Sequence, residues 1–459
     1  MTGVSLQSPP LLLQVKMYTF DPALQATSAK KERVVWLIFM GIVFFLLYGA
    51  ANQIAGITAP HPSFYMEWEK KIPFIEVFIV PYMSSDLMFV VAFLLPYTRL
   101  ELRVLAARVL FIVLLSSLIF VLFPLQFAFE KPEIEHFHFL FGLLEADLPF
   151  NQLPSLHISF AIVLWVSMKK YLHNTFLKAL ILFWFFLIAL STLFVYQHHF
   201  IDIPTGLLMG IIAVKVIKED EDRFFVSQFM TPRSLKMGLY FLLGSVVFMV
   251  LSLKSSGFLA AFCVWIFLSL FSVSIVYAFG LNTLLAGKNV KASFGHWMLF
   301  APYFLGSYLS WYYYKRKLAL MAHVKENIYL GRYPSQDEYE ILKAEGIKRC
   351  INLATEQQCH TSQMAQTRFS FLDQTIQSPE ALHRAVLQIE EDKEEGVYVH
   401  CALGLSRSVL LIWAWMLYKQ YSLEEIEVCM EEVRPAYVKS PYMGITLDIY
   451  KDYLEELAE

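Results

Sequence analysis

The sequence predicts a two-part fold: an α-helical polytopic membrane domain of about eight to nine transmembrane helices, followed by a soluble α/β domain. Hydrophobic residues make up 57% of the 459 residues, whereas charged residues make up 17%, compared with about 25% in average soluble domains. Residues 1–317 hold 24 Lys and Arg against 17 Asp and Glu, and residues 318–459 hold 13 against 23. This split indicates a membrane body with basic loops and an acidic soluble domain, which argues against nucleic acid as a partner.

The first apolar run follows Lys30, Lys31 and Arg33, and no cleavable signal is evident. Residues 1–33 are therefore expected to be an N-terminal cytoplasmic segment. The second and fourth apolar runs are short for a span of about 20 residues. Nine candidate transmembrane runs lie near 34–51, 80–96, 104–123, 155–168, 179–196, 203–217, 237–253, 258–281 and 294–314.

Basic residues concentrate in alternate connections between these runs. With the N-terminus inside, the connections predicted to be cytoplasmic hold most of the Lys and Arg residues, which agrees with the positive-inside rule through eight helices. The ninth run breaks the rule because it would carry Lys315, Arg316 and Lys317 to the outside. The Pro302-containing ninth run could instead enter and return, or lie at the membrane interface.

From residue 318 the pattern changes to short apolar strands, such as "NIYLG", "RCINLA" and "GVYVHCA", alternating with amphipathic stretches such as 378–393. This pattern is typical of an α/β domain. Its cysteines have no disulfide spacing, which favours a reducing compartment. No metal-ligand spacing or cofactor motif is evident, so we expect neither a metal nor a cofactor.

The segment "VYVHCALGLSRSVLL" carries the clearest chemical signal. An apolar strand ends at Cys401, and a helix pattern begins near Arg407. Backbone N–H groups in such a loop can surround a phosphate, and the helix N-terminus adds a favourable dipole. This environment favours a Cys401 thiolate, which Ser406 and Ser408 are placed to stabilise, while Arg407 can hold two phosphate oxygens. The predicted phosphate-binding residues are Ala402, Leu403, Gly404, Leu405, Ser406 and Arg407.

With "IYLGRYPS", "GIKRCINLA" and "VRPAYVKSP", this loop makes residues 326–450 resemble a dual-specificity phosphatase of the cysteine-dependent protein tyrosine phosphatase class. The resemblance implies that Cys401 is the nucleophile and that Arg407 binds phosphate. It also implies an acid on a loop before the cysteine, and "FSFLDQTIQSP" places Asp373 there. A loop aspartate that caps the following helix is the alternative for Asp373.

Two histidine motifs lie in the membrane body. "LPSLHISFA" contains Ser155 and His157 at the start of a helix, and "STLFVYQHHFIDIPTG" contains His198 and Asp202, four residues apart and expected on one helical face. Ionisable residues in membrane segments are functional candidates. An imidazole held by a carboxylate is an activated base or nucleophile, and a second histidine can protonate a leaving alkoxide.

These motifs resemble those of the type 2 phosphatidic acid phosphatase superfamily, over residues 34–217. The resemblance implies a six-helix core, a nucleophilic His198 oriented by Asp202, a general acid at His157 and a phosphate contact from Ser155. Thr192 stands where the family has arginine, and the upstream basic motif is missing. The "YQHHFIDIPTG" form is more similar to the branch of inositol phosphorylceramide and sphingomyelin synthases, which also lack that arginine.

The whole chain thus resembles a bacterial fusion of these two domains, with additional helices over 218–317 and the phosphatase domain over 318–459. We expect a multi-pass inner-membrane phosphatase that acts on phospholipid or lipid-linked phosphate in the bilayer. The histidine motifs are expected to face the periplasm, and the cysteine domain the cytoplasm. The alternatives are a headgroup phosphotransferase with a regulatory phosphatase tail, and a phosphatase of phosphoproteins on an inactive membrane anchor.

Overall fold

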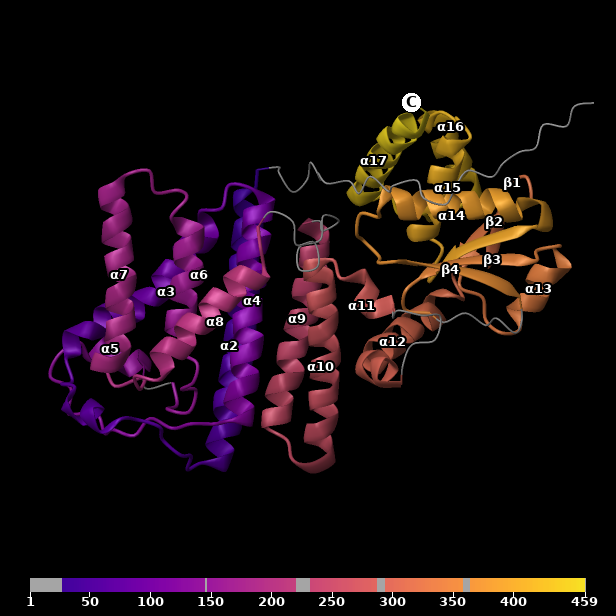
Figure 1. The fold of residues 1–459 in the computed structure, drawn as a ribbon. Coiled ribbons are helices and arrows are strands. Elements are labelled where there is room, and N and C mark those ends of the chain that lie inside the picture. The colour runs from indigo at the N-terminus through magenta and orange to yellow at the C-terminus, as the bar shows by residue number, and fades with distance from the viewer. Residues whose placement is uncertain (1–26, 145–146, 220–231, 287–293, 358–363, 459) are drawn as a thin grey trace, which may run out of the picture.

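The computed structural model describes residues 27–458 except 145–146, 220–231, 287–293 and 358–363. It has two parts (Figure 1). Helices α2 to α10 form a bundle. A sheet with its covering helices lies next to this bundle, and α9 and α10 stand between it and α2. The predicted combination of an apolar helical domain and a C-terminal α/β domain is confirmed.

Each of the nine apolar runs coincides with a helix. Among the described residues, α2, the segment Glu76–Leu94, α4, α7, α9 and α10 are long and apolar enough to cross a membrane. Helices α6 and α8 have 13 and 15 residues, fewer than the 20 or so that a span needs. The nine helices are α2 (Lys30–Thr58), α3 (Ile79–Leu94), α4 (Arg99–Leu122), α6 (Leu156–Met168), α7 (Thr175–Phe194), α8 (Asp202–Val216), α9 (Pro232–Leu253), α10 (Gly257–Phe279) and α12 (Phe294–Tyr314).

Polar caps begin two of the long helices. The Thr98 hydroxyl accepts a hydrogen bond from the Glu101 N–H, and the Glu101 carboxylate accepts one from the Thr98 N–H. This capping box starts α4. The Asn174 side chain accepts hydrogen bonds from the N–H groups of Phe176 and Leu177 and starts α7.

Helices α6 and α8 pack unusually closely. A Cβ atom on Gly206 would lie 2.7 Å from the Ser155 carbonyl oxygen, and one on Gly210 would lie 2.8 Å from that of Ser159. Small residues four apart allow two helix backbones to approach in this way. The contact matters for function because Ser155 and His157 begin the α6 side of the predicted histidine site.

The helices of the bundle alternate in direction and define two ends. The Ser28 N–H donates to the Tyr97 carbonyl at one end, and the His61 N–H donates to the Gln126 side chain at the other. Helices α9 and α10 form one further hairpin, so α10 ends at the same end of the bundle at which α2 begins. The α/β domain follows from that end. We call the end with residues 27–33, 95–98 and 169–174 the N-terminal end. The opposite end, with residues 59–78, 123–144, 147–155 and 195–201, is the histidine end.

Two further helices connect the bundle to the α/β domain. Helix α11 (Asn282–Ala286) is short, and α12 appears nearly end-on in Figure 1, so it crosses the direction of α9 and α10. Helix α12 contains Pro302 and is not among the six helices of spanning length and composition in the described chain. That the ninth run does not cross the membrane stays a prediction.

The sheet has the strand order β1-β2-β5-β3-β4, with β1 antiparallel to β2 and the other pairs parallel. The three apolar strands predicted from the sequence are β2, β3 and β5. All five residues of β5 are buried at the centre. The strands are β1 (Met321–Lys325), β2 (Ile328–Arg332), β3 (Arg349–Ala354), β4 (Ala365–Phe371) and β5 (Val397–Cys401).

Helices cover this sheet. The predicted amphipathic stretch forms α14, which Ser378 caps by accepting a hydrogen bond from the Ala381 N–H. The central helix α15 follows β5 directly and is buried over most of its length. The helices are α13 (Glu338–Ala344), α14 (Pro379–Asp392), α15 (Arg407–Tyr418), α16 (Leu423–Val433) and α17 (Pro441–Ala458).

Candidate active sites

The loop from Cys401 to Arg407 joins the last residue of β5 to the first residue of α15, as predicted. The Gly404 N–H donates to the Cys401 Sγ over 3.3 Å. Gly404 has a φ of 71°, and a Cβ there would lie 2.5 Å from the Gly331 carbonyl. Only glycine fits such a position without displacing β2. The curled backbone therefore depends on Gly404.

The Cys401 thiol lies at the floor of this loop, 3.4 Å from the Ser408 hydroxyl. Burial raises the pKa of the Cys401 thiol, but the Arg407 charge and hydrogen bonds from Ser408 outweigh burial, so the net pKa is lowered. A lowered pKa makes more of the nucleophilic thiolate available at neutral pH. Of the two serines predicted to stabilise the thiolate, Ser408 contacts it, while the Ser406 hydroxyl bonds the Tyr442 hydroxyl.

Arg407 is held by a carboxylate that the sequence motif does not include. Its Nη1 and Nη2 atoms donate to the two oxygens of Glu356 over 2.9 and 2.5 Å, and Nη1 also donates to the Phe371 carbonyl over 3.0 Å. Burial raises the pKa of Glu356, but the Arg407 charge and the hydrogen bonds that Glu356 accepts together outweigh burial, so the net pKa is lowered and Glu356 is held as a carboxylate. The guanidinium is thus oriented at the edge of the loop before phosphate arrives.

Asp373 lies on the loop after β4, and its Oδ1 is 3.6 Å from the Arg407 Nε. Its side chain is 37% exposed, whereas Arg407 is almost fully buried. The Gln377 side chain donates to the carbonyls of Leu372 and Thr375 and closes the loop on itself. The structure therefore brings Asp373 beside the phosphate loop, as an acid acting on a leaving group there would need.

Arg434, in the segment "VRPAYVKSP", supports the loop from behind. Its guanidinium donates to the carbonyls of Gly404, Leu403 and Ala319 over 3.1, 3.1 and 2.9 Å. Within the loop, Arg434 therefore holds the carbonyls of Leu403 and Gly404. No chemical motif marks this role in the sequence.

At the histidine end of the bundle, His198 Nδ1 lies 3.1 Å from Asp202 Oδ2, and both side chains are buried. The rings of His198 and His157 have centroids 6.0 Å apart. The expectation that His198 and Asp202 share a helical face is wrong: α7 ends at Phe194, and His198 lies in the turn before α8, which begins at Asp202. Tyr196, with a φ of 52°, reverses the chain there.

The Ser155 side chain is buried beside these residues. Its Oγ has no hydrogen-bond partner among the described residues, and its N–H donates to the Asp202 carbonyl over 3.3 Å. A buried hydroxyl without a partner is costly unless a ligand satisfies it. At Thr192, where the resemblance predicts arginine, the side-chain hydroxyl donates to the Ala189 carbonyl, and the backbone carbonyl accepts the N–H groups of Gln197 and His198.

A second histidine–carboxylate pair lies next to the first. His199 Nδ1 is 3.1 Å from Glu69 Oε2, and its Nε2 accepts a hydrogen bond from the Ala128 N–H. The His199 N–H donates to Asp202 Oδ2 over 3.0 Å. Glu69 thus fixes the turn that carries His198, although it lies 130 residues away in sequence.

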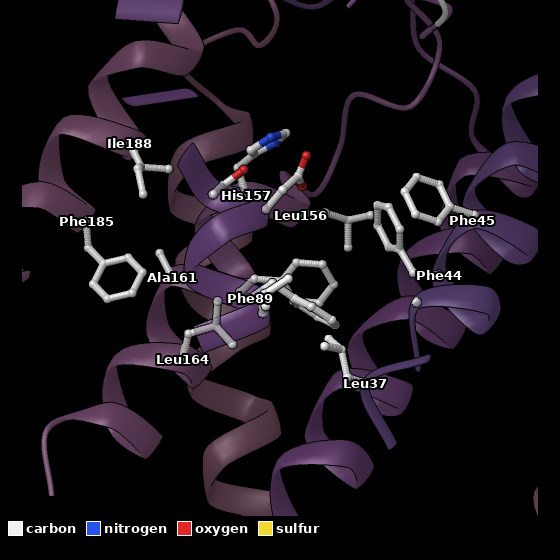
Figure 2. A pocket seen from close by; sticks show the side chains of 15 residues that line it. Leu37, Phe44, Phe45, Phe89, Leu156, His157, Ala161, Leu164, Phe185 and Ile188 are labelled. Atoms are coloured by element: carbon white, nitrogen blue, oxygen red, sulfur yellow. The ribbon is translucent and has the colours of Figure 1, made fainter. Parts of the chain in front are cut away.

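An apolar pocket of about 330 Å³ opens below the histidine site, between α2, α3, α6 and α7. Figure 2 shows His157 at one end, with Phe89, Leu164 and Leu37 farther along the cavity. Ser85 and Asp86 are the other polar residues in its wall. The pocket therefore has a polar end at the catalytic candidates and an apolar body, as a lipid chain would require.

Family models match both parts of the chain. Residues 102–224 match the model described as "PAP2 superfamily", and residues 328–451 match "Dual specificity phosphatase, catalytic domain". One match lies in the helical bundle and the other in the α/β domain. Together with the cysteine loop, these matches support a phosphoric monoester hydrolase.

Among curated proteins, the chain is 31% identical over 119 residues to the protein-tyrosine-phosphatase IBR5 of Arabidopsis thaliana, which covers 25% of the chain and 45% of IBR5. The chain thus spans less than half of that relative. Among solved structures, Tk-PTP in its active form is 22% identical, covering 29% of this chain and 96% of Tk-PTP with a TM-score of 0.27. PTPMT1 in complex with PI(5)P is 21% identical, covering 31% and 100% with a TM-score of 0.28.

Proposed function

We propose that the protein is an integral membrane phosphatase that hydrolyses phosphate monoesters of phospholipids or lipid-linked phosphates. The observation that carries the proposal is the Cys401 thiol, whose pKa is lowered inside a curled backbone loop that ends at Arg407. A phosphoryl group is the tetrahedral anion that fits this arrangement. The apolar pocket beside His157 supports a lipid substrate.

In the cysteine site, the Cys401 thiolate attacks phosphorus, and the bond from phosphorus to the substrate oxygen breaks. Asp373 donates its proton to the leaving alkoxide, so a neutral alcohol and a cysteinyl phosphate remain. Asp373, now a carboxylate, takes a proton from water as the water oxygen attacks phosphorus and releases the thiolate and inorganic phosphate. The loop N–H groups and Arg407 stabilise the charge on the phosphoryl oxygens in both steps.

In the membrane site, His198 Nε2 is the nucleophile, because Nδ1 faces Asp202. It forms a phosphohistidine as His157 protonates the departing alkoxide, and water then releases phosphate. Ser155 Oγ, without a partner among the described residues, donates to a phosphoryl oxygen.

A second function has its own support. Thr192 supplies no positive charge where the family has arginine, and the pocket next to His157 could hold a lipid alcohol in place of water. The membrane site would then transfer a phospho-headgroup, and the cysteine domain would regulate it. A phosphatase of phosphoproteins on an inactive anchor is the third possibility.

We further propose that the chain is a multi-pass protein of a bacterial inner membrane, with the histidine site facing the periplasm and the cysteine site the cytoplasm. The positions of the two sites support this, since the histidine site lies at one end of the bundle and the α/β domain follows from the other. A reporter active only in the periplasm, fused after residue 320 and after residue 458, tests it. Strong activity of both fusions would place the two sites on the same side.

The main experiment measures phosphate release by the purified protein from phosphatidic acid, phosphatidylglycerophosphate and a phosphoinositide, and headgroup transfer to diacylglycerol. The variants are Cys401→Ser, His198→Ala and the double variant. We expect each single variant to lose one component of lipid turnover and the double variant to lose both. Full activity in the double variant would refute both sites, and turnover of a phosphopeptide alone would favour the third possibility.

A further inference from the structure

Helix α12 exposes an aromatic surface that the α/β domain does not cover. Its residues are 39–79% exposed, although they are large and hydrophobic. Contiguous exposed apolar surface of this kind marks an interaction site. The residues are Phe294, Trp297, Met298, Leu305, Tyr308, Leu309, Tyr312, Tyr313 and Tyr314.

Three cations end this surface. The Lys315 ammonium lies 4.9 Å from the ring centroid of Trp311, Arg316 lies 5.1 Å from that of Tyr312, and Lys317 lies 4.3 Å from that of Tyr313. Within the described part of the chain, none of the three forms an ion pair with a carboxylate. Tyr and Trp beside Lys and Arg are typical of the headgroup level of a membrane, and clustered cations favour anionic lipids.

The same helix is attached to the cysteine site. Trp311 Nε1 donates to the Tyr333 carbonyl over 2.8 Å, and the Tyr333 N–H donates to the carbonyl of Ala402 in the phosphate loop over 3.1 Å. Two hydrogen bonds therefore connect α12 to the residue after Cys401. Any surface on which α12 rests is held at a fixed position relative to the thiol.

The loop of Asp373 also packs on these helices. Leu372, which is fully buried, lies in one apolar cluster with Val276 of α10 and Phe300 of α12. The phenol groups of Tyr277 on α10 and Tyr303 on α12 lie close enough to interact with the charges of Asp373, Glu356 and Arg407. The cysteine site thus faces the helices, and α10 and α12 form one side of the approach to it.

We infer that the surface formed by the exposed aromatic residues of α12 and by Lys315, Arg316 and Lys317 lies in the headgroup layer of an anionic membrane and presents phosphorylated lipids to Cys401. This inference rests on the proposed phosphatase function and adds its substrate source. The three cations concentrate anionic headgroups beside α12, and the aromatic rings hold the helix at the level where a lipid phosphate lies. A soluble phosphoprotein would need none of these features.

The test uses the full-length protein with His198→Ala, so that only the cysteine site can act on lipid. The variant Lys315→Gln/Arg316→Gln/Lys317→Gln removes the charges and keeps the aromatic rings. The matched control, Lys343→Gln/Lys348→Gln/Lys451→Gln, removes three exposed cations elsewhere on the α/β domain. The substrates are phosphatidic acid in vesicles that also contain phosphatidylglycerol, and p-nitrophenyl phosphate in solution.

We expect the α12 variant to lose at least about tenfold in lipid turnover, because each basic residue near an anionic surface adds to the attraction between them. Turnover of p-nitrophenyl phosphate should stay unchanged. The control should match its parent, the full-length His198→Ala protein, on both substrates. Raising the salt concentration should reduce lipid turnover by the parent and much less by the α12 variant.

Unchanged lipid turnover in the α12 variant would overturn the inference, as would an equal loss on both substrates, because the charges would then affect the fold of the site. A parent that prefers a phosphopeptide to the vesicle lipid would also overturn it. Failure of the parent to hydrolyse p-nitrophenyl phosphate would instead refute the proposed function.

Discussion

The Ser408 hydroxyl provides a quantitative test of the thiolate. Ser408→Ala removes the hydrogen bond to the Cys401 Sγ, 3.4 Å away in the buried loop, and leaves the Gly404 N–H contact in place. A hydrogen bond to a charged group contributes about 1.5–3 kcal/mol, and a tenfold change in an acid dissociation constant corresponds to about 1.4 kcal/mol. Because the bond stabilises the thiolate, its loss should raise the pKa of Cys401 by about 1–2.

The assay is the pH dependence of Cys401 alkylation by iodoacetamide, together with the acid limb of kcat/KM for p-nitrophenyl phosphate. Both curves should move to higher pH in Ser408→Ala, and at a pH below the pKa of the wild-type thiol the rate should fall by about one to two orders of magnitude. Ser406→Ala is the control for the alkylation curve, since the Ser406 hydroxyl bonds Tyr442 rather than the thiol. Alkylation curves that coincide for Ser408→Ala and the wild type would refute the role of Ser408.

Three further predictions follow from the two sites. Cys401→Ser should abolish turnover of p-nitrophenyl phosphate while vanadate binding, measured calorimetrically, persists, because the loop N–H groups and Arg407 remain; substantial residual turnover would exclude a cysteine nucleophile. Asp373→Asn should lose most rate on alkyl phosphates, whose leaving groups have a high pKa, and should flatten the alkaline limb of the pH profile; an equal loss on aryl and alkyl phosphates would indicate a structural role. In a Cys401→Ser background, His198→Ala should remove the remaining lipid turnover and Asp202→Asn should reduce it less, since Asp202 orients rather than reacts; parental turnover in both variants would favour an inactive anchor.

Local sequence predicted the cysteine loop because its chemistry lies within seven consecutive residues. A strand that ends at Cys401, a glycine that permits the turn and an arginine that begins a helix determine the geometry without help from distant segments. The nine apolar runs could likewise be recognised from neighbouring residues alone, and each corresponds to a helix.

The partners that orient these groups could not be found in this way. Glu356 meets Arg407 from 51 residues away, and Glu69 meets His199 from 130 residues away. Such pairs depend on which strand ends and loops the fold brings together, and hydropathy does not encode that. One signal was present: Glu356 follows β3, and parallel strands that neighbour each other end at the same edge of the sheet.

The placement of His198 shows a different limit. A spacing of four residues is compatible with a helix and also with a turn that leads into one. Here the positive φ of Tyr196 ends α7 early. The contact with Asp202 is therefore made from a loop, whose orientation depends on the Glu69–His199 pair.

The packing of Leu372 among α10 and α12 has a kinetic consequence. A catalytic domain on a flexible linker tumbles freely and meets its substrate by diffusion in three dimensions. A domain that is fixed to the bundle through the Asp373 loop keeps a constant orientation. Its encounters with a membrane substrate then take place in two dimensions. The rate should depend on the mole fraction of substrate in the leaflet, and diluting the substrate with inert lipid should slow the enzyme even when the bulk concentration is held constant.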